Sequence, residues 1–374
     1  MLPDFKLETY FSKWEFTARY HMCASDMESM SVAELLALAG DDDIAAWDAL
    51  RLGYTETFGA PELRQAIADT YESMDASNIL TFAGAEEGIF AAMNVLLEVG
   101  DHALVVTPNY QAAETIPSAI CDVTGIPLDP AENWNLDLDA VRNALKPNTR
   151  LISINFPHNP TGTVIDRPTL DGLIDIAAAR GIRIFSDEVY RLLERDDSLR
   201  LPQVADVYDG GVSLNVMSKA YGLPGLRIGW IACRDHRLLA RMERLKHYLS
   251  ICNSAPAEIL ARIALKASDS ILGRNRDIIR GNLGLLEEFF DEFADLFEWS
   301  VPDGGCIGYP RYLGKEGVEE FCRRLVEESG VLLLPASVYS STLTETPTDR
   351  FRIGFGRFGM ADGLAAMRPY LRGG

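Results

Sequence analysis

The most constraining feature of this sequence is a regular alternation of short apolar runs and longer amphipathic segments between residues 79 and 232. The apolar runs are rich in β-branched and aromatic residues and have the length of buried strands. They are Ile79–Phe82, Ala103–Val106, Leu151–Phe156, Ile182–Phe185, Leu214–Met217 and Ile228–Ala232. Segments such as Glu87–Glu98 and Leu170–Arg180 have helical spacing. This order predicts an α/β fold with a mostly parallel sheet that is covered by helices on both faces.

A different pattern begins near residue 235. It predicts longer helices, among them Asp277–Phe297, followed by short strands around residues 305–310, 331–335 and 351–355. A chain of 374 residues is long enough for two domains. We therefore predict a large α/β domain at 45–245 and a small α+β domain made of 1–44 and 246–374. In this arrangement the N-terminal segment packs with the C-terminal part.

Composition narrows the classes of partner. The 35 basic and 55 acidic side chains give a net charge of −20, which disfavours nucleic acid and anionic membranes. The first residues mix charges with aromatic rings, unlike a signal peptide, and no stretch reaches the ~18 apolar residues of a membrane helix. The cysteines and histidines lack the spacing of metal ligands or of a disulfide framework. We therefore expect a cytoplasmic protein without a metal, acting on a small molecule.

Small or polar residues follow the predicted strands, at the sheet edge where open α/β proteins bind ligands. The turn Gly84–Glu86 follows the first strand and begins a helix, whose free N–H groups favour an anion. Tyr110 follows the second strand and is either a stacking platform for a planar group or a core tyrosine. Asn159 presents an amide between turn-forming residues. Asp187 follows a buried strand, where a carboxylate needs a cationic partner.

Lys219 follows the predicted strand Leu214–Met217, and Arg227 comes eight residues later. Taken alone, a lysine is more often a solvated surface charge than a reactive group. Its position among the polar strand ends instead favours an amine that binds a cofactor aldehyde, with the arginine held nearby for a phosphate.

Together these residues resemble the class I and II aminotransferases, which use pyridoxal 5'-phosphate and form the fold type I group. The motifs span nearly the whole chain, and their order and spacing are more specific than any one of them. They are Tyr54 with Gly59–Arg64, Gly84–Glu86, Pro108–Tyr110, Asn159–Gly162, Asp187–Tyr190, Ser218–Lys219 with Arg227, and Arg350–Gly354. The resemblance implies the fold type I architecture, with a mostly parallel central sheet and a smaller α+β domain.

The resemblance also implies catalytic roles. Lys219 would hold the cofactor aldehyde as a Schiff base and then act as the base at the substrate α-carbon. Asp187 would keep the pyridine nitrogen protonated, so that the ring takes up electrons. Tyr190 and Asn159 would hydrogen-bond the ring hydroxyl, and Tyr110 would stack on the ring.

The remaining cofactor contacts implied by the resemblance form a cup for the phosphate. Its members are Gly84, Ala85, Glu86, Ser218, Arg227 and Tyr54. In this family the residue that corresponds to Tyr54 comes from the neighbouring subunit. A homodimer with shared active sites is therefore expected.

Arg352 is the implied clamp for the substrate α-carboxylate, because a guanidinium binds a carboxylate through two parallel hydrogen bonds. Arg350 and Arg357 are nearby alternatives. We favour Arg352 because its Arg-Ile-Gly-Phe context fits the family pattern best. Asn159 and Ser25 complete the predicted substrate-binding residues.

Two positions depart from the family pattern. Val216 stands three residues before Lys219, where many relatives carry a hydroxyl for the phosphate. Glu86 stands where a hydroxyl, amide or lysine often reaches the phosphate, and a carboxylate there would repel the dianion. We therefore expect the Glu86 side chain to turn away, which leaves the phosphate dependent on Arg227 and the helix N-terminus.

Three classes of function are compatible with these residues. The first is transamination, in which an L-amino acid passes its amino group to a 2-oxo acid. The second is a lyase or cyclase, because residues 18–30 resemble the capreomycidine synthase-like branch, which implies β-elimination and ring closure on an arginine-derived substrate. The third is a regulatory protein that binds the cofactor without turnover, and no basic patch supports it.

The segment 18–30 also carries Asp26 and Glu28. If either carboxylate faces the pocket, we expect a preference for a polar or cationic substrate side chain. The alternative is that both are solvated loop charges.

Overall fold

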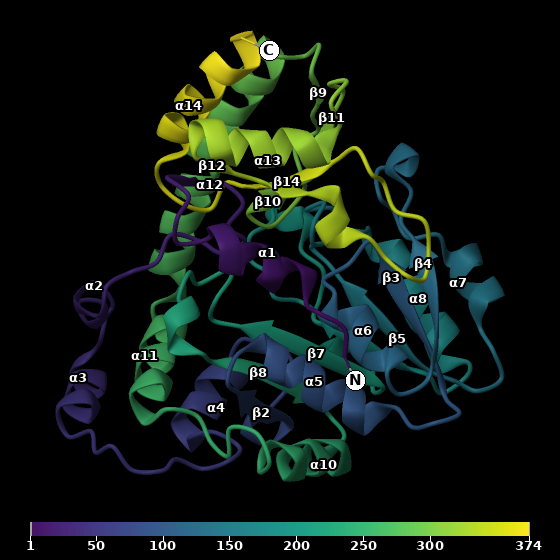
Figure 1. Ribbon diagram of the computed structural model, residues 1–374. Coiled ribbons are helices and arrows are strands. Elements are labelled where there is room, and N and C mark those ends of the chain that lie inside the picture. Colours follow the sequence, from purple (N-terminus) through teal and green to yellow (C-terminus); the bar gives the residue numbers. More distant parts are fainter. Residues whose placement is uncertain (1, 374) are drawn as a thin grey trace.

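The computed structural model describes residues 2–373 and contains one large sheet with a second, smaller unit above it (Figure 1). The large sheet has seven strands in the order β2-β8-β7-β6-β5-β3-β4. Strand β8 is antiparallel to both of its neighbours, and the other pairs are parallel. The strands are β2 (Ile79–Phe82), β3 (His102–Thr107), β4 (Asp122–Pro127), β5 (Thr149–Asn155), β6 (Arg183–Asp187), β7 (Gly211–Val216) and β8 (Gly229–Cys233). The prediction of a mostly parallel α/β sheet is confirmed.

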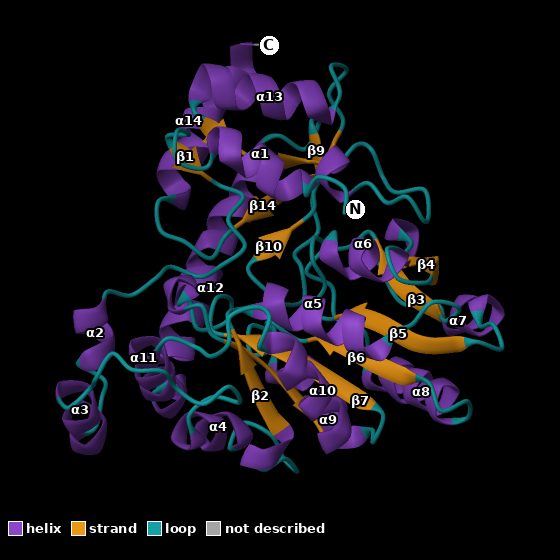
Figure 2. Cartoon of the chain, turned by 60° about the horizontal axis from the view of Figure 1, so that its bottom comes forward, coloured by secondary structure: helices purple, strands orange, loops and turns teal. Residues whose placement is uncertain are grey.

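Alternate residues of these strands enter two separate apolar cores, one on each face of the sheet. Leu104, Ile152 and Ile184 pack with α7 (Leu138–Ala144) and α8 (Arg167–Ala178). Their chain neighbours Ala103, Leu151 and Phe185 belong to the core that includes α5 (Ala85–Leu96) and α10 (His236–Lys246). Figure 2 shows the sheet between these helices. Further helices around the sheet are α6 (Ala112–Ser118) and α9 (Val204–Val207).

The smaller unit is built around α12 (Ser268–Glu292), which begins nine residues before the predicted helix. It contains the antiparallel sheet β10-β14-β13 and the pair β11-β9. The strands are β9 (Phe297–Glu298), β10 (Ile307–Gly308), β11 (Arg311–Tyr312), β12 (Val331–Leu332), β13 (Leu334–Pro335) and β14 (Phe351–Gly354). The helices α13 (Val318–Ser329) and α14 (Met360–Gly373) cover them.

The two ends of the chain meet in this unit. Strand β1 (Tyr20–His21) pairs in parallel with β12, and α1 (Lys6–Trp14) contacts the 3-10 helix η5 (Ala336–Tyr339). Other 3-10 helices are η1 (Ala76–Asn78), η2 (Pro130–Glu132), η3 (Asp197–Leu199) and η4 (Pro224–Leu226).

Helix α11 (Ala255–Lys266) packs against α4 (Pro61–Ala68), α2 (Val32–Leu36) and α3 (Asp41–Asp48). Its buried residues Leu260, Ala261, Ile263 and Ala264 form the contact face. The division at residue 245 stays a prediction, and α11 lies with helices that border the large sheet rather than with α13 and α14 (Figure 1).

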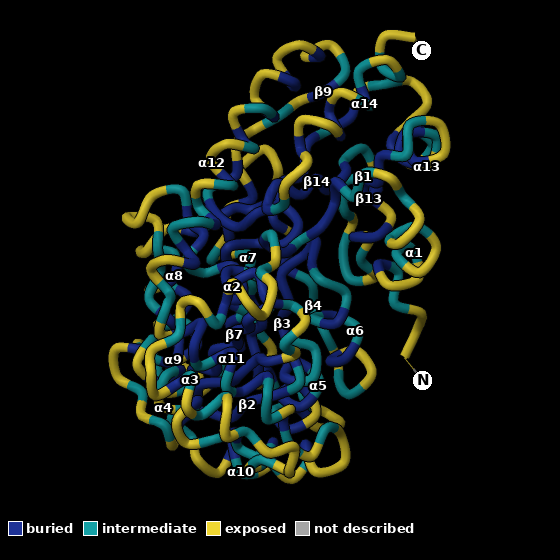
Figure 3. The backbone as a smooth tube through the Cα atoms, turned by 90° about the vertical axis from the view of Figure 1, so that its left-hand side faces the viewer, coloured by how far each residue is buried: buried dark blue, intermediate teal, exposed yellow. Residues whose placement is uncertain are grey.

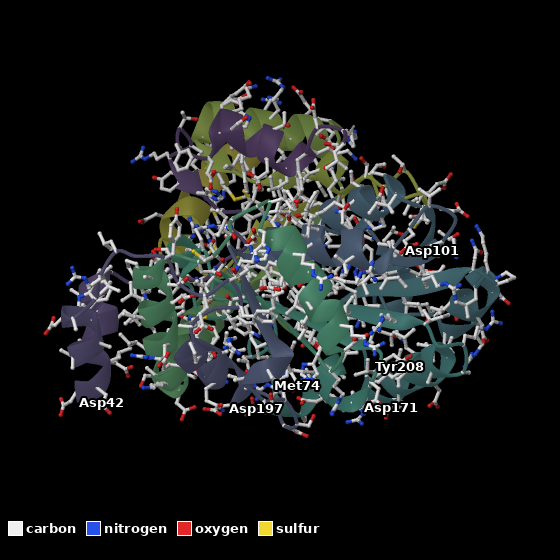
Figure 4. The ribbon with its side chains drawn as sticks, turned by 90° about the horizontal axis from the view of Figure 1, so that it is seen from below. Asp42, Met74, Asp101, Asp171, Asp197 and Tyr208 are labelled. Atoms are coloured by element: carbon white, nitrogen blue, oxygen red, sulfur yellow. The ribbon has the colours of Figure 1, made fainter. Side chains whose placement is uncertain are left out.

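Burial is concentrated where the sheet and the smaller unit meet, and most exposed backbone lies at the periphery (Figure 3). Acidic side chains such as Asp42, Asp171 and Asp197 lie at the outer rim in the view from below (Figure 4). Across residues 2–373, no helix has both the length and the apolar content that crossing a membrane requires.

Candidate active site

The carboxyl ends of β5, β6 and β7 meet at one edge of the sheet and border a cavity of about 560 Å³. Asn155 ends β5, Asp187 ends β6, and Lys219 follows β7 after a short turn. Because the strands are parallel neighbours, these side chains converge on the cavity. The cavity is also lined by the predicted residues Ser25, Ala85, Glu86, Tyr110, Asn159, Tyr190, Ser218, Arg227 and Arg352.

Lys219 is held at the floor of the cavity. The N–H of Gly222, which has a φ of 66°, donates to the Lys219 carbonyl and closes the turn after β7. The Nζ of Lys219 donates to Ser25 Oγ at 2.8 Å. Burial lowers the pKa of the amine, while the Asp26 carboxylate opposes that shift. A buried amine with a lowered pKa has the properties of a nucleophile and proton acceptor.

Asp187 lies beside this amine. Burial raises its pKa to about 6, and the hydrogen bond from the Val189 N–H at 3.2 Å and the charge of Lys219 act in the opposite direction. The predicted need for a cationic partner is thus only partly met by the protein. A protonated ring nitrogen in the cavity would stabilise the ionised carboxylate.

The N-terminus of α5 and Arg227 form an anion-binding corner. Gly84 caps the helix with a φ of 92°, and a Cβ there would lie 2.4 Å from Nη2 of Arg227. Glycine therefore allows the guanidinium to lie against the helix end. Arg227 donates to the carbonyls of Pro224 at 3.3 Å and Ala83 at 3.4 Å. The free N–H groups of the first turn and this cation favour a phosphate.

The side chain of Glu86 does not turn away, which corrects the expectation from the sequence. It lines the cavity, and its Oε2 is buried without a hydrogen-bond partner in the part of the chain that the structure describes. Burial raises the pKa of this carboxyl to about 7, and the Tyr110 phenol beside it opposes the shift. The expectation assumed a charged carboxylate, whereas a buried carboxyl can take up a proton. Val216 also lines the cavity and adds no polar atom.

Arg352 is fully buried on β14. Its Nη2 donates to the Cys23 carbonyl at 2.8 Å, and its Nη1 donates to Asn159 Oδ1 at 3.4 Å. Among residues 2–373, the Arg352 Nε has no hydrogen-bond partner. Tyr339, which the sequence did not single out, donates to the same Asn159 oxygen at 3.3 Å. A buried guanidinium with an unused donor is suited to a carboxylate ligand.

The alternatives Arg350 and Arg357 are occupied elsewhere. Arg350 Nη1 donates to the Tyr309 carbonyl at 3.0 Å, and its guanidinium lies 5.0 Å from the centre of the Trp134 ring. Arg357 lines the cavity but forms an ion pair with Asp26 at 2.8 Å. Arg352 differs from both in lining the cavity without an acidic partner and in having a buried Nε with no hydrogen-bond partner among residues 2–373.

The two acidic residues of the 18–30 segment have different surroundings. Asp26 lines the cavity, but the Arg357 guanidinium compensates its charge through both carboxylate oxygens. Glu28 accepts from the Phe358 N–H at 2.9 Å and is not part of the cavity lining. Neither is a free carboxylate aimed at a substrate side chain.

Tyr190 is buried and its hydroxyl donates to the Ser25 carbonyl at 3.1 Å. Lys219 Nζ lies 5.9 Å from the centre of its ring. Tyr110 contacts Phe5, with ring centres 5.2 Å apart, and lines the cavity wall. Tyr54 is different: its side chain is 90% exposed and is not part of the cavity lining.

Helix α1 borders the cavity, a contact that the sequence did not predict. Leu7, Glu8 and Phe11 on this helix, and Glu15 just after it, line the cavity. Glu8 and Glu15 lie seven residues apart and therefore on the same face of the helical segment. The seven-residue spacing of the two glutamates, next to the apolar Leu7 and Phe11, is the sequence signal that could have indicated a helix lining the cavity.

These features fit pyridoxal 5'-phosphate. The cavity offers a buried amine in Lys219, a carboxylate for a ring nitrogen in Asp187 and a helix N-terminus with Arg227 for a phosphate. The orphaned Glu86 Oε2 and Arg352 Nε are polar atoms that a bound group would satisfy.

The chain matches the family described as Aminotransferase class I and II over residues 26–362. Capreomycidine synthase from Streptomyces vinaceus is 29% identical over 99% of this chain and 94% of its own. A probable N-succinyldiaminopimelate aminotransferase from Mycobacterium tuberculosis is 32% identical over 79% of this chain and 77% of its own.

Solved structures agree with these relatives. A PLP-dependent aminotransferase from Streptococcus suis has a TM-score of 0.92 at 30% identity, covering 99% of this chain and 98% of its own. A PLP-dependent cyclase, OrfR, has a TM-score of 0.90 at 27% identity, covering 100% and 98%. The strand-end lysine, aspartate and arginines thus lie in a known architecture, and the chain belongs to the fold type I, pyridoxal-phosphate-dependent family of class I and II aminotransferases.

Proposed function

We propose that the protein transfers the amino group of an L-amino acid to a 2-oxo acid. The observation that carries this proposal is the position of Lys219. Its buried amine, with a lowered pKa, shares one cavity with Asp187 and with the unused donor of Arg352. One end of the cavity is thus suited to the substrate carboxylate, and the other to the reacting amine.

When bound, pyridoxal 5'-phosphate supplies an aldehyde that reacts with amines and a ring that takes up electrons from the substrate α-carbon. Lys219 binds the cofactor and moves the proton at that carbon. Asp187 would keep a proton on the ring nitrogen. Tyr190 and Asn159 would hold the ring hydroxyl, and Tyr110 would pack against the bound group.

Arg352 binds the carboxylate of both the amino acid and the oxo acid, since both substrates carry this group. Asn159 holds the guanidinium from the side, and Ser25 holds the Lys219 amine at 2.8 Å until the cofactor binds. The buried position of Arg352 excludes water from the carboxylate and strengthens the ion pair.

Ala85, Ser218 and Arg227 bind the phosphate, with Gly84 giving Arg227 its place. The exposed Tyr54 completes the same group from a second copy of the chain, which makes the active unit a homodimer. This assignment is supported by the 90% exposure of the Tyr54 side chain in a single chain.

A panel of amino acids tests the proposal. The protein loaded with pyridoxal 5'-phosphate is expected to have a yellow absorbance that borohydride removes. In Lys219→Ala the cofactor is expected not to become covalently attached. Conversion to the pyridoxamine form by an amino acid, reversed by a 2-oxo acid, would establish transamination. A protein that binds the cofactor but reacts with no amino acid would instead be a regulatory protein.

A lyase or cyclase is the second candidate. It is favoured by similarity along nearly the whole chain to capreomycidine synthase and to the cyclase OrfR. The carboxylates of Glu8 and Glu15 at the cavity also suit a cationic side chain, such as that of an arginine derivative. Release of water or ammonia, or a cyclic product, without any second oxo acid would establish this reaction instead of transamination.

A further inference from the structure

Glu86 is the residue of the phosphate corner whose chemistry is unexplained. It is the second residue of α5, next to Ala85, and its side chain lies against the cavity rather than in solvent. Its Oε2 is buried and has no hydrogen-bond partner among the described residues. The helix N-terminus and Arg227 attract a phosphate dianion to this corner. A charged Glu86 carboxylate would repel that dianion, whereas a neutral carboxyl would not.

The corner also has few side-chain donors besides Arg227. Val216 contributes only methyl groups there, and Ser218 is the remaining hydroxyl of this strand end. A protonated carboxyl has one O–H donor and one carbonyl acceptor. Glu86 in that form would have an O–H available for an anion.

We propose that Glu86 binds the cofactor phosphate as a neutral carboxylic acid, donating its O–H to a phosphate oxygen and replacing the hydroxyl that Val216 lacks. From the sequence, Glu86 departs from the family pattern and would repel the phosphate as a carboxylate. In the neutral form it is instead a hydrogen-bond donor to that phosphate. The proposal rests on the placement of the phosphate beside Arg227 in the proposed function.

The surroundings of Glu86 favour the neutral form. Tyr110, Glu8 and Asp187 face it from β3–α6, α1 and β6. Burial, with a smaller contribution from the two carboxylates, raises its pKa to about 7. Tyr110 acts against this shift. The cations that line the same cavity are Lys219, Arg227, Arg352 and Arg357, the last of which is paired with Asp26. A phosphate dianion placed beside the carboxyl raises its pKa further, so binding is coupled to proton uptake above neutral pH.

The test is the affinity of the cofactor-free protein for pyridoxal 5'-phosphate, measured by calorimetry at several pH values. Glu86→Gln keeps a neutral donor at every pH and serves as the reference. The ratio of the wild-type Kd to the Glu86→Gln Kd is expected to rise about tenfold between roughly pH 6 and pH 8, because the wild type must take up one proton. Glu86→Ala, which lacks the donor, is expected to bind more weakly than wild type near pH 6.

The proton itself is measurable. Calorimetry in buffers of different ionisation enthalpy is expected to show about one more proton taken up by wild type than by Glu86→Gln at roughly pH 8. Pyridoxal, which has no phosphate, is expected to show neither difference. A ratio of dissociation constants that stays constant with pH, or Glu86→Ala binding as tightly as wild type near pH 6, would overturn the proposal. So would the same pH effect with pyridoxal.

Two controls separate this proposal from the site assignment on which it rests. Arg227→Gln is expected to weaken binding of pyridoxal 5'-phosphate at every pH, and failure to do so would mean that the phosphate lies elsewhere. Glu8→Gln removes a carboxylate from the same cavity at a more exposed position. Glu8→Gln is expected to keep the pH dependence of cofactor affinity seen in wild type. If it instead reproduced the effect of Glu86→Gln, the effect would come from the total charge of the cavity and not from a hydrogen bond of Glu86.

Discussion

Replacing Arg352 by lysine tests the carboxylate clamp most directly. The change keeps the positive charge but exchanges a planar group with several donors for a compact ammonium. In the structure, Arg352 Nη2 and Nη1 are held by the Cys23 carbonyl and Asn159 Oδ1, so the guanidinium is fixed before substrate arrives. A lysine at this position cannot keep both contacts and also offer two parallel bonds to a carboxylate.

The expected loss is that of one charge-assisted hydrogen bond, about 1.5–3 kcal/mol. Since 1.36 kcal/mol corresponds to tenfold, kcat/KM for an amino acid is expected to fall by roughly 10- to 150-fold. Both half-reactions are expected to slow, because amino acid and oxo acid each carry the carboxylate.

The assay is the single-turnover conversion of the cofactor by stopped-flow absorbance, with the preferred amino acid and with an amine that lacks the α-carboxylate. For the amine, Arg352→Lys and wild type are expected to react equally, within about twofold. The matched control is Arg350→Lys on the same chain segment, because Arg350 points to Trp134 and is not part of the cavity lining. Equal losses for amino acid and amine, or equal effects of both lysine variants, would refute the assignment of Arg352.

Three further changes probe the scaffold. Gly84→Ala is expected to weaken pyridoxal 5'-phosphate binding in a dialysis assay, because its Cβ would lie 2.4 Å from Arg227 Nη2. Unchanged affinity would contradict the anion-binding corner formed by Arg227 and the N-terminus of α5. Lys246→Met is expected to lower the free energy of unfolding by about 3 kcal/mol in urea denaturation, since the Thr57 and Thr81 carbonyls and Asn253 Oδ1 each lose one hydrogen bond. The exposed Lys266→Met should cost about 1 kcal/mol or less. Burial lowers the pKa of His158 from 6.5 to about 4, so the stability that neutral His158 contributes above pH 6.5 is lost as the pH falls toward 4. His158→Gln should therefore reduce the dependence of the free energy of unfolding on pH in this range. An unchanged dependence would contradict this role of His158.

The sequence predicted the large sheet well because buried strands carry a local signal. Each of the six apolar runs lies within or next to an observed strand, and their order gives the parallel sheet. Strand β4 was missed because Asp122–Pro127 is an edge strand, with glycine and proline in it and only Ile126 buried. The other edge strand, β2, is buried along its whole length and does leave an apolar run, so it was predicted.

The candidate site was predictable where each residue belongs to a motif at a strand end. It was not predictable where a contact depends on tertiary packing, as with Tyr339 on Asn159 and α1 beside the cavity. The raised pKa of Glu86 also follows from its burial in the fold rather than from residue type. Likewise, the pairing of Asp26 with Arg357 joins residues that are distant in the chain, and only the fold brings them together.

The pairing of β1 with β12 has a consequence for the order in which the protein is made. The cofactor end of the cavity comes from residues of the central sheet, whereas Arg352 and its anchor at Cys23 come from opposite ends of the chain. During synthesis, the sheet can assemble while the C-terminal strands are still inside the ribosome. The carboxylate end then forms after the sheet, when β12 emerges and pairs with β1, a segment made before the sheet.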